Sequence, residues 1–261
     1  MTRVPLSPKH NLGQHFLVDE NLLGVIERLA ELNPADHVLE IGPGMGVLTA
    51  FLAERVARID AVEIDRSLEP ELRSRLAGFT NTDLHFGDAL TLDLGVLAPE
   101  ATKLISNLPY QIATPLIVES LDGLPGIRRW CVMVQREVAE RLFATPRTKA
   151  YGAVSVLVQL AATRSGFHAV SREVFRPRPR VDSALVAFQR KPLPADFKRV
   201  KQIVVAAFAH RRKTIVNSLV LAGAASREQA EAALTRVGSP SDLRAEALTP
   251  DEFVAFAEAL S

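Results

Sequence analysis

Along the first 145 residues, segments with the apolar spacing of a helix alternate with short apolar runs typical of a strand. Leu22, Leu23, Ile26 and Leu29 recur at the spacing of one helical face, so residues 19–32 are predicted to form an amphipathic helix. Strands are predicted at Val38–Ile41, Arg58–Ile64, Leu84–Phe86, Lys103–Ser106 and Trp130–Gln135, and helices at Val47–Arg55, Ser67–Ala77 and Thr114–Leu121. This alternation predicts an α/β fold with a doubly wound, mostly parallel sheet.

The pattern changes after the last of these strands. Helices are predicted at Arg136–Phe143 and Ala153–Ala162, and β-like runs at Gly166–Val170 and Ser183–Gln189 are expected to add an antiparallel edge to the sheet. The loop Phe175–Arg180 joins the two runs, Lys191–Asp196 is typical of a linker, and the remainder is helical, with capped helix starts at Ser226 and Thr249. We therefore expect a catalytic domain over residues 1–190 and a small all-α domain over residues 191–261.

Composition narrows the class of protein. The 261 residues are 48% apolar, enough for a substantial core, and they contain neither a basic leader followed by an apolar run nor an apolar segment of 18 residues. We therefore expect a soluble, cytoplasmic protein without a membrane partner. Cys131 is the only cysteine and the six histidines have no metal-ligand spacing, so neither a disulfide framework nor a bound metal is expected.

The net charge of +1 conceals a strong asymmetry along the chain. Residues 164–213 contain thirteen Lys and Arg against three acids, a charge of +10, whereas the rest of the chain carries −9. We expect a set of basic side chains in this segment to contact RNA phosphates: Arg176, Arg178, Arg180, Arg211, Arg212 and Lys213. Two alternatives stay open: ordinary solvated surface, or, for residues 211–213, helix-cap or interdomain partners.

Three segments predict a cofactor site at the carboxyl ends of the first strands. Gly42, Gly44 and Gly46 follow the first strand, where glycine lets the backbone turn tightly and approach a ligand. Glu63 ends the second strand, where a carboxylate can accept both ribose hydroxyls, and Asp88 follows the third, where it can accept from an adenine amine. Pro43 removes one amide donor from the loop, which favours a ligand without phosphates. The alternatives are a plain turn and two solvated acids.

A second motif, Asn107-Leu108-Pro109-Tyr110, follows the fourth strand. Methyl transfer to an adenine N6 needs the amine lone pair turned towards the methyl group, which two acceptors for its N–H groups would favour. The side-chain oxygen of Asn107 and the carbonyl of Leu108 or Pro109 can supply them, while Tyr110 stacks on a base turned out of its helix. The alternative is an ordinary turn at a strand end.

The chain resembles the KsgA-type family of ribosomal RNA adenine dimethyltransferases over nearly its whole length. The matching segments are Leu12–Leu17, Glu40–Gly46, Glu63–Asp65, Gly87–Ala89, Asn107–Tyr110, Gln135–Ala139, Tyr151–Gly152, Phe175–Ser183 and Phe208–Lys213. The resemblance implies a Rossmann-like fold that binds S-adenosylmethionine (SAM). It assigns cofactor contacts to His15, Leu17, Gly42, Gly44, Glu63, Ile64, Asp88, Ala89 and Asn107, and places Phe175 with Tyr110 around the target adenine. His15 stands where the family usually has asparagine.

The resemblance also implies the substrate. Such proteins dimethylate two adjacent adenosines in the 3′-terminal hairpin loop of 16S rRNA, within an immature small ribosomal subunit, and we expect a monomer acting in subunit biogenesis. Two alternatives remain: an Erm-type methyltransferase of large-subunit rRNA, and a methyltransferase-like nucleic-acid-binding or assembly factor without catalysis. Leu108 and the helical tail with its basic cluster favour the small-subunit enzyme, and the intact Glu63, Asp88, Asn107 and Tyr110 favour catalysis.

Overall fold

A computed structural model describes residues 16–17 and 20–260, which form two compact units. The first unit contains the described residues up to Ala139 together with Arg164–Gln189, and the second contains Glu140–Thr163 and the described residues from Arg190 onwards. The expected boundary at residue 190 is close to the third crossing of the chain between the units. No local pattern in the sequence indicates that residues 140–163 pack with the helical unit rather than with the sheet.

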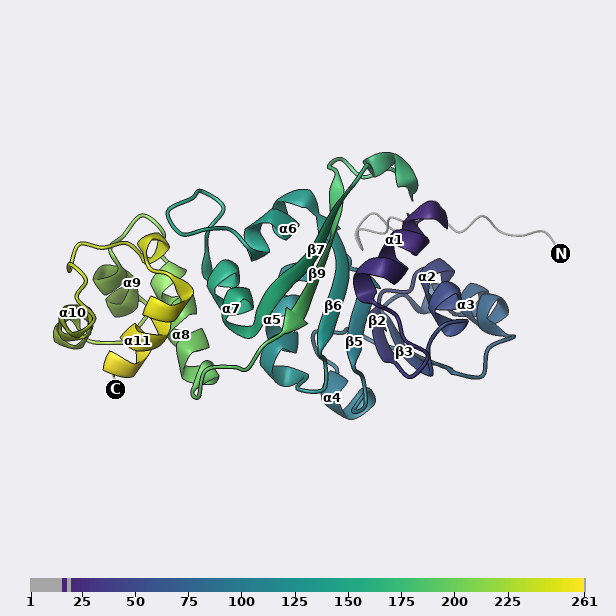
Figure 1. Cartoon of the computed structure of the whole chain (residues 1–261), viewed down its shortest axis with the longest axis horizontal. Helices are drawn as coiled ribbons and strands as arrows, with labels where there is room; N and C mark the ends of the chain where they lie inside the picture. Colours follow the sequence, from purple (N-terminus) through teal and green to yellow (C-terminus); the bar gives the residue numbers. More distant parts are fainter. Residues whose placement is uncertain (1–15, 18–19, 261) are drawn as a thin grey trace. The chain divides into compact units, whose positions relative to one another are not determined.

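A seven-stranded sheet forms the centre of the first unit (Figure 1). Its order is β4 (Thr82–Phe86), β3 (Arg58–Glu63), β2 (His37–Ile41), β5 (Lys103–Asn107), β6 (Arg129–Gln135), β9 (Ser183–Arg190) and β7 (Ala162–Val170). The first five strands are parallel, and β9 runs antiparallel to β6. The expected doubly wound sheet with an antiparallel edge is confirmed. The strand order reverses between β2 and β5, which is where ligands bind in open sheets of this kind.

Helices cover both faces of the sheet because its central strands are apolar on both sides. On one face, α1 (Glu20–Ala30) and α2 (Val47–Ala53) bury Ile26 and Leu52 against strand residues such as Ile105 and Met133. On the other, Trp130 of β6 donates a hydrogen bond to Ser120 of α5 (Ala113–Gly123) at 2.9 Å and stacks on Phe188. Shorter elements complete the unit: η2 (Arg66–Leu68), α3 (Glu69–Leu76), α4 (Leu94–Leu97) and α6 (Arg136–Leu142), which continues into the second unit.

A second, two-stranded sheet joins distant parts of the chain. β1 (Phe16–Leu17) pairs antiparallel with β8 (Phe175–Arg176), which follows η3 (Arg172–Val174). The sequence predicted a loop at Phe175–Arg180, because two-residue strands carry no periodic signal. Other predicted boundaries differ less from the observed ones, as β7 begins at Ala162 rather than Gly166. The expected helix start at Asp19 lies outside the described residues.

The second unit is helical, as expected for the tail. It contains α7 (Ala153–Ala161), α8 (Phe197–Phe208), α9 (Ile215–Leu221), α10 (Arg227–Arg236), η4 (Ala245–Ala247) and α11 (Pro250–Ala259). The predicted capped starts are confirmed, since Ser226 and Thr249 each form a reciprocal capping box with the residue three positions on. Tyr151 lies in the core of this unit, packs edge-on against Phe208 and donates a hydrogen bond to the Leu248 carbonyl at 2.8 Å.

Candidate cofactor and substrate site

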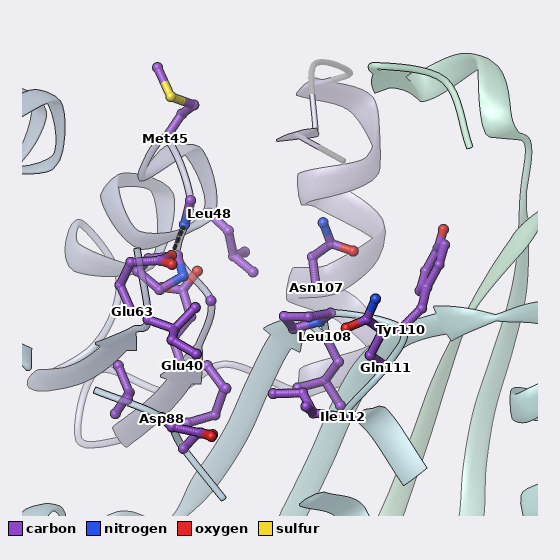
Figure 2. A pocket seen from close by; sticks show the side chains of 18 of the residues that line it. Glu40, Met45, Leu48, Glu63, Asp88, Asn107, Leu108, Tyr110, Gln111 and Ile112 are labelled. Carbon is purple, nitrogen blue, oxygen red and sulfur yellow. Dashed lines mark hydrogen bonds between the residues drawn. The ribbon is translucent and has the colours of Figure 1, made fainter. Parts of the chain in front are cut away.

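A cavity of about 270 Å³ opens at the carboxyl ends of β2, β3, β4 and β5. The parallel register brings the ends of these strands to one edge, so the four segments that follow them can line a single site. Residues 40–45, 62–64, 87–89 and 107–112, with two residues of α2, form the lining. Figure 2 shows Glu40, Glu63 and Asp88 on one side of the cavity and Asn107 and Tyr110 on the other.

The glycine loop lies directly against the Asn-Leu-Pro-Tyr turn. Gly42 has a φ of 74°, and a Cβ atom at this position would come within 3.1 Å of the Pro109 ring. Only glycine combines that backbone conformation with such a close approach. Gly44 and Gly46 also have positive φ, and Gly46 leads directly into α2. The two sequence motifs are therefore packed together at the point where the strand order reverses.

Glu63 holds the glycine loop from the end of β3. One carboxylate oxygen accepts from the Gly44 N–H at 3.0 Å and the other from the Asp65 N–H at 2.9 Å. The side chain is only 4% exposed, and this burial raises the pKa of Glu63, while the backbone hydrogen bonds oppose the rise. A carboxylate fixed in this way keeps lone pairs that can accept from ligand hydroxyls.

Glu40 is a second acid in the lining, and sequence reasoning did not single it out. It lies on β2, is 1% exposed, and its Oε2 has no hydrogen-bond partner among the described residues. Burial raises the pKa of Glu40 to about 8; the Thr49 hydroxyl opposes the rise and the charge of Glu63 adds to it. A carboxyl group inside the otherwise apolar run Val38–Ile41 was the available signal, because an acid is rarely buried without a reason.

The remaining lining residues surround a space whose charge suits a cationic ligand. Ile64 is 50% exposed, Asp88 is half-buried with Oδ1 accepting from the Leu90 N–H, and Ala89 is buried. Three carboxyl groups line the cavity, and none of its described lining residues is Lys, Arg or His. That donor set suits SAM, which carries a sulfonium and an ammonium group, and it does not suit a polyphosphate cofactor.

The Asn-Leu-Pro-Tyr turn connects β5 to α5. Asn107 is the last residue of β5, and the Leu108 N–H donates to the Met133 carbonyl on β6. The Pro109 carbonyl accepts from the Ile112 and Ala113 N–H groups at 3.1 Å each, so both of its lone pairs serve the start of α5. Of the two carbonyls considered for the target amine, Leu108 is therefore the better candidate.

Tyr110 is half-buried at the rim of the cavity. Its hydroxyl group lies 2.7 Å from the Ser183 hydroxyl on β9. Burial raises the pKa of Tyr110, so the phenol is neutral at physiological pH. The hydrogen bond from β9 fixes the ring direction, and sequence reasoning had no signal for it because Ser183 lies 73 residues further along the chain.

The structure does not bring Phe175 to this cavity. Phe175 is fully buried in the core formed with α1 and is not among the residues that line the site. In this conformation it cannot stack on a base, which corrects the expected arrangement with Tyr110; β8 holds it in the core by pairing with β1. Leu17 lies in β1 opposite Phe175, and His15 lies outside the described residues.

The six basic residues fall into two groups on different units. Arg176, Arg178 and Arg180 are exposed on the first unit, where Arg178 pairs with Glu173 at 2.6 Å. On the second unit Arg211 donates to the carbonyls of Lys149 and Tyr151 at 3.1 Å.

Arg211 therefore contributes to the fold of the second unit, through contacts inside that unit rather than the helix-cap or interdomain contacts considered as alternatives. Arg212 and Lys213 are exposed.

The sequence predicted neither a bound metal nor a membrane partner. Within residues 16–17 and 20–260, no group of three or more His, Cys, Asp or Glu side chains is placed to hold a metal ion. In the same part of the chain, none of the helices is long and apolar enough to cross a membrane.

Comparison with known proteins gives a consistent result. The family model for ribosomal RNA adenine dimethylase matches residues 6–260. The protein named ribosomal RNA small subunit methyltransferase A from Rubrobacter xylanophilus is 47% identical over 255 residues, covering 97% of this chain and 95% of that protein. The protein of the same name from Pelotomaculum thermopropionicum is 42% identical, covering 99% and 93%.

Solved structures support the fold. A dimethyladenosine transferase from Plasmodium falciparum superposes with a TM-score of 0.77 at 24% identity, covering 93% of this chain and 96% of that chain. The 23S rRNA methyltransferase ErmE superposes with a TM-score of 0.67 at 30% identity, covering 94% and 99%. The first likeness concerns the fold alone.

Proposed function

Because the chain belongs to the ribosomal RNA adenine dimethylase family, we propose that it dimethylates the N6 amines of two adjacent adenosines in the 3′-terminal hairpin loop of 16S rRNA. The substrate is an immature small ribosomal subunit in the cytoplasm, and the protein acts as a monomer in subunit biogenesis. One observation carries the proposal: a cavity with three acids and no Lys, Arg or His among its described lining residues faces an Asn-Leu-Pro-Tyr turn across the switch point of the sheet.

Two of the three acids of the cavity hold the methyl donor. Bound SAM supplies an electrophilic methyl group on a positively charged sulfur. Glu63 accepts from the ribose hydroxyls while its backbone hydrogen bonds keep it in place, and Asp88 accepts from the adenine amine. Gly42 and Gly44 let the backbone approach the ligand, and Ile64 and Ala89 supply apolar surface. His15 and Leu17 are proposed to contact the same ligand by family resemblance.

The turn after β5 positions the target adenine. Asn107 Oδ1 and the Leu108 carbonyl accept from the two N–H groups of the amine, which turns its lone pair towards the methyl group. Pro109 fixes the turn and packs on Gly42, so acceptors and cofactor loop keep a constant spacing. Tyr110 stacks on the base, with its ring held by Ser183.

This arrangement needs no strong general base. Nitrogen acquires its positive charge only as the methyl group arrives, after which the proton is acidic and passes to solvent. Catalysis then rests on orientation, which can lower a barrier by several kcal/mol when both reactants are held. The exposed Arg176, Arg178, Arg180, Arg212 and Lys213 are proposed to contact rRNA phosphates and to set the position of the subunit.

The large-subunit alternative has one observation in its favour, the 30% identity to ErmE, which is lower than the 47% identity to a small-subunit enzyme.

Purified protein and methyl-labelled SAM should be incubated with small and with large ribosomal subunits from cells that lack dimethyladenosine. We expect two dimethylated adenosines, with four methyl groups per small subunit and none in the large subunit. Label in the large subunit supports the Erm-type function, and SAM binding without label in either supports a non-catalytic assembly factor.

A further inference from the structure

Glu40 is a buried acid that the proposed chemistry does not use. It sits among apolar residues in β2, between the strands that carry Glu63 and Asn107, and it lines the same cavity. Its Oε2 is shielded from solvent and has no hydrogen-bond partner among the described residues. A buried polar atom without a partner costs free energy, so it needs either a proton or a ligand to offset the cost.

Among the residues that the structure describes, the charged groups near Glu40 are acidic. Glu63 of β3 adds a negative charge beside Glu40, with the buried Asp65 next to Glu63, and Asp88 lines the cavity from the segment after β4. From α2 the neutral Thr49 hydroxyl lies beside Glu40, although its oxygen does not reach hydrogen-bond geometry with a described residue. From β5, Asn107 is neutral. None of the described residues that line the empty cavity would therefore supply a compensating positive charge to an ionised Glu40.

We propose that Glu40 couples cofactor binding to the release of a proton: it is a neutral carboxylic acid in the empty cavity and becomes a carboxylate when the positively charged methyl donor enters. The inference rests on the proposed function, because it takes SAM as the ligand. In the coupled step the Glu40 O–H bond breaks, the proton passes to solvent, and the bonding electron pair stays on the carboxylate.

The coupling favours the methyl donor over its product. SAM has a positive sulfur, whereas S-adenosylhomocysteine, which remains after methyl transfer, has a neutral sulfide. The donor therefore stabilises an ionised Glu40 more than the product does, and loss of the sulfur charge draws a proton back to Glu40. Glu40 is thus a specificity-determining residue that acts through charge, and it favours exchange of product for new donor.

The sign of the pH dependence follows from the free protein. Because burial raises the pKa of Glu40 to about 8, most molecules carry the proton at pH 7. Binding that requires the ionised form strengthens as pH rises, by about tenfold from pH 6 to 7 and about fivefold from pH 7 to 8, and levels off near pH 9. The α-amino group of SAM, with a pKa near 8, titrates in the same range but equally for wild type and variants.

Proton release can be counted directly with the full-length protein. SAM is titrated calorimetrically at pH 7 in phosphate and in Tris, whose ionisation enthalpies differ, so that the difference in heat gives the number of protons released. We expect about one proton for wild type with SAM, a clearly smaller number with S-adenosylhomocysteine, and a loss of most of the release in Glu40→Gln. Glu100→Gln, an exposed acid outside the cavity, is the matched control and should match wild type.

Each outcome decides a separate point. Equal proton release by wild type and Glu40→Gln, or no release by wild type, overturns the inference while SAM binding itself persists. Absence of SAM binding by wild type contradicts the proposed function instead. If Glu40→Gln does not fold, wild type is titrated with SAM at pH 7 and at pH 9.5 instead. Proton release should be much smaller at the higher pH, because Glu40 is then already ionised in the free protein, and unchanged release overturns the inference.

Discussion

Replacing Glu63 by alanine should weaken SAM binding more than it weakens the fold. The size of the expected loss in SAM affinity follows from the surroundings of Glu63. The residue is 4% exposed, and backbone N–H groups already hold both carboxylate oxygens at 2.9–3.0 Å. A fixed acceptor in a dry site is worth about 1–3 kcal/mol to a ligand hydroxyl that would otherwise be buried unpaired. The dissociation constant for SAM should therefore rise by roughly 5- to 150-fold.

The same substitution also affects the free protein. The Gly44 and Asp65 N–H groups lose their acceptor, which costs about 1–3 kcal/mol of unfolding free energy in total if water replaces part of the bonding. Burial raises the pKa of Glu63. The contribution of Glu63 to the unfolding free energy of wild type is therefore complete at low pH, and it is partly lost as the pH rises through the raised pKa. The stability gap between wild type and Glu63→Ala should accordingly narrow with rising pH.

Calorimetric titration with SAM, combined with denaturant unfolding at pH 5 and pH 8, measures both effects. Glu63→Gln is informative beside alanine because its amide has one acceptor and one donor end. It can satisfy only one of the two backbone N–H groups, so it should also weaken binding, and Glu100→Gln should change neither quantity. A Glu63→Ala protein that binds SAM within twofold of wild type would remove Glu63 from the cofactor site and refute this reasoning.

Three further variants test the roles of the turn after β5, the basic residues of the second unit and Phe175. Asn107→Ala should lower turnover on small subunits by at least tenfold with the melting temperature nearly unchanged; near-normal turnover would sink its role. Charge-neutral Arg212→Gln with Lys213→Gln should weaken subunit binding and flatten its salt dependence by about 0.7–0.9 in log–log slope per lost phosphate contact; an unchanged slope argues against RNA contact. Phe175→Ala should lower unfolding free energy by about 3–5 kcal/mol, because the ring is fully buried; a small change with lost turnover would instead favour a base-facing Phe175.

The sheet was predictable from the sequence because its strands are short apolar runs separated by strong turn signals. The Gly42 and Asn107 motifs were predictable for the same reason, since each directly follows such a run. That both motifs pack against each other required the parallel register and the reversal of strand order, which no local pattern encodes.

Other features depend on contacts between residues far apart in the chain. The Tyr110–Ser183 hydrogen bond spans 73 residues, and the β1–β8 pair is too short for a periodic signal. Phe175 illustrates the limit of resemblance, because a matching motif does not report whether a side chain faces the site or the core. Glu40 was visible as an acid in an apolar strand, but only the structure shows that its Oε2 lacks a described partner.

The proposed dimethylation of 16S rRNA can be tested in cells that lack this protein. Methyladenosine in their rRNA is mapped by mass spectrometry, with wild type or Asn107→Ala supplied in trans. We predict that both dimethyladenosines of the 3′-terminal hairpin loop disappear from 16S rRNA and return only with the wild-type protein. Their persistence in the deletion strain, or a loss confined to 23S rRNA, would contradict the account.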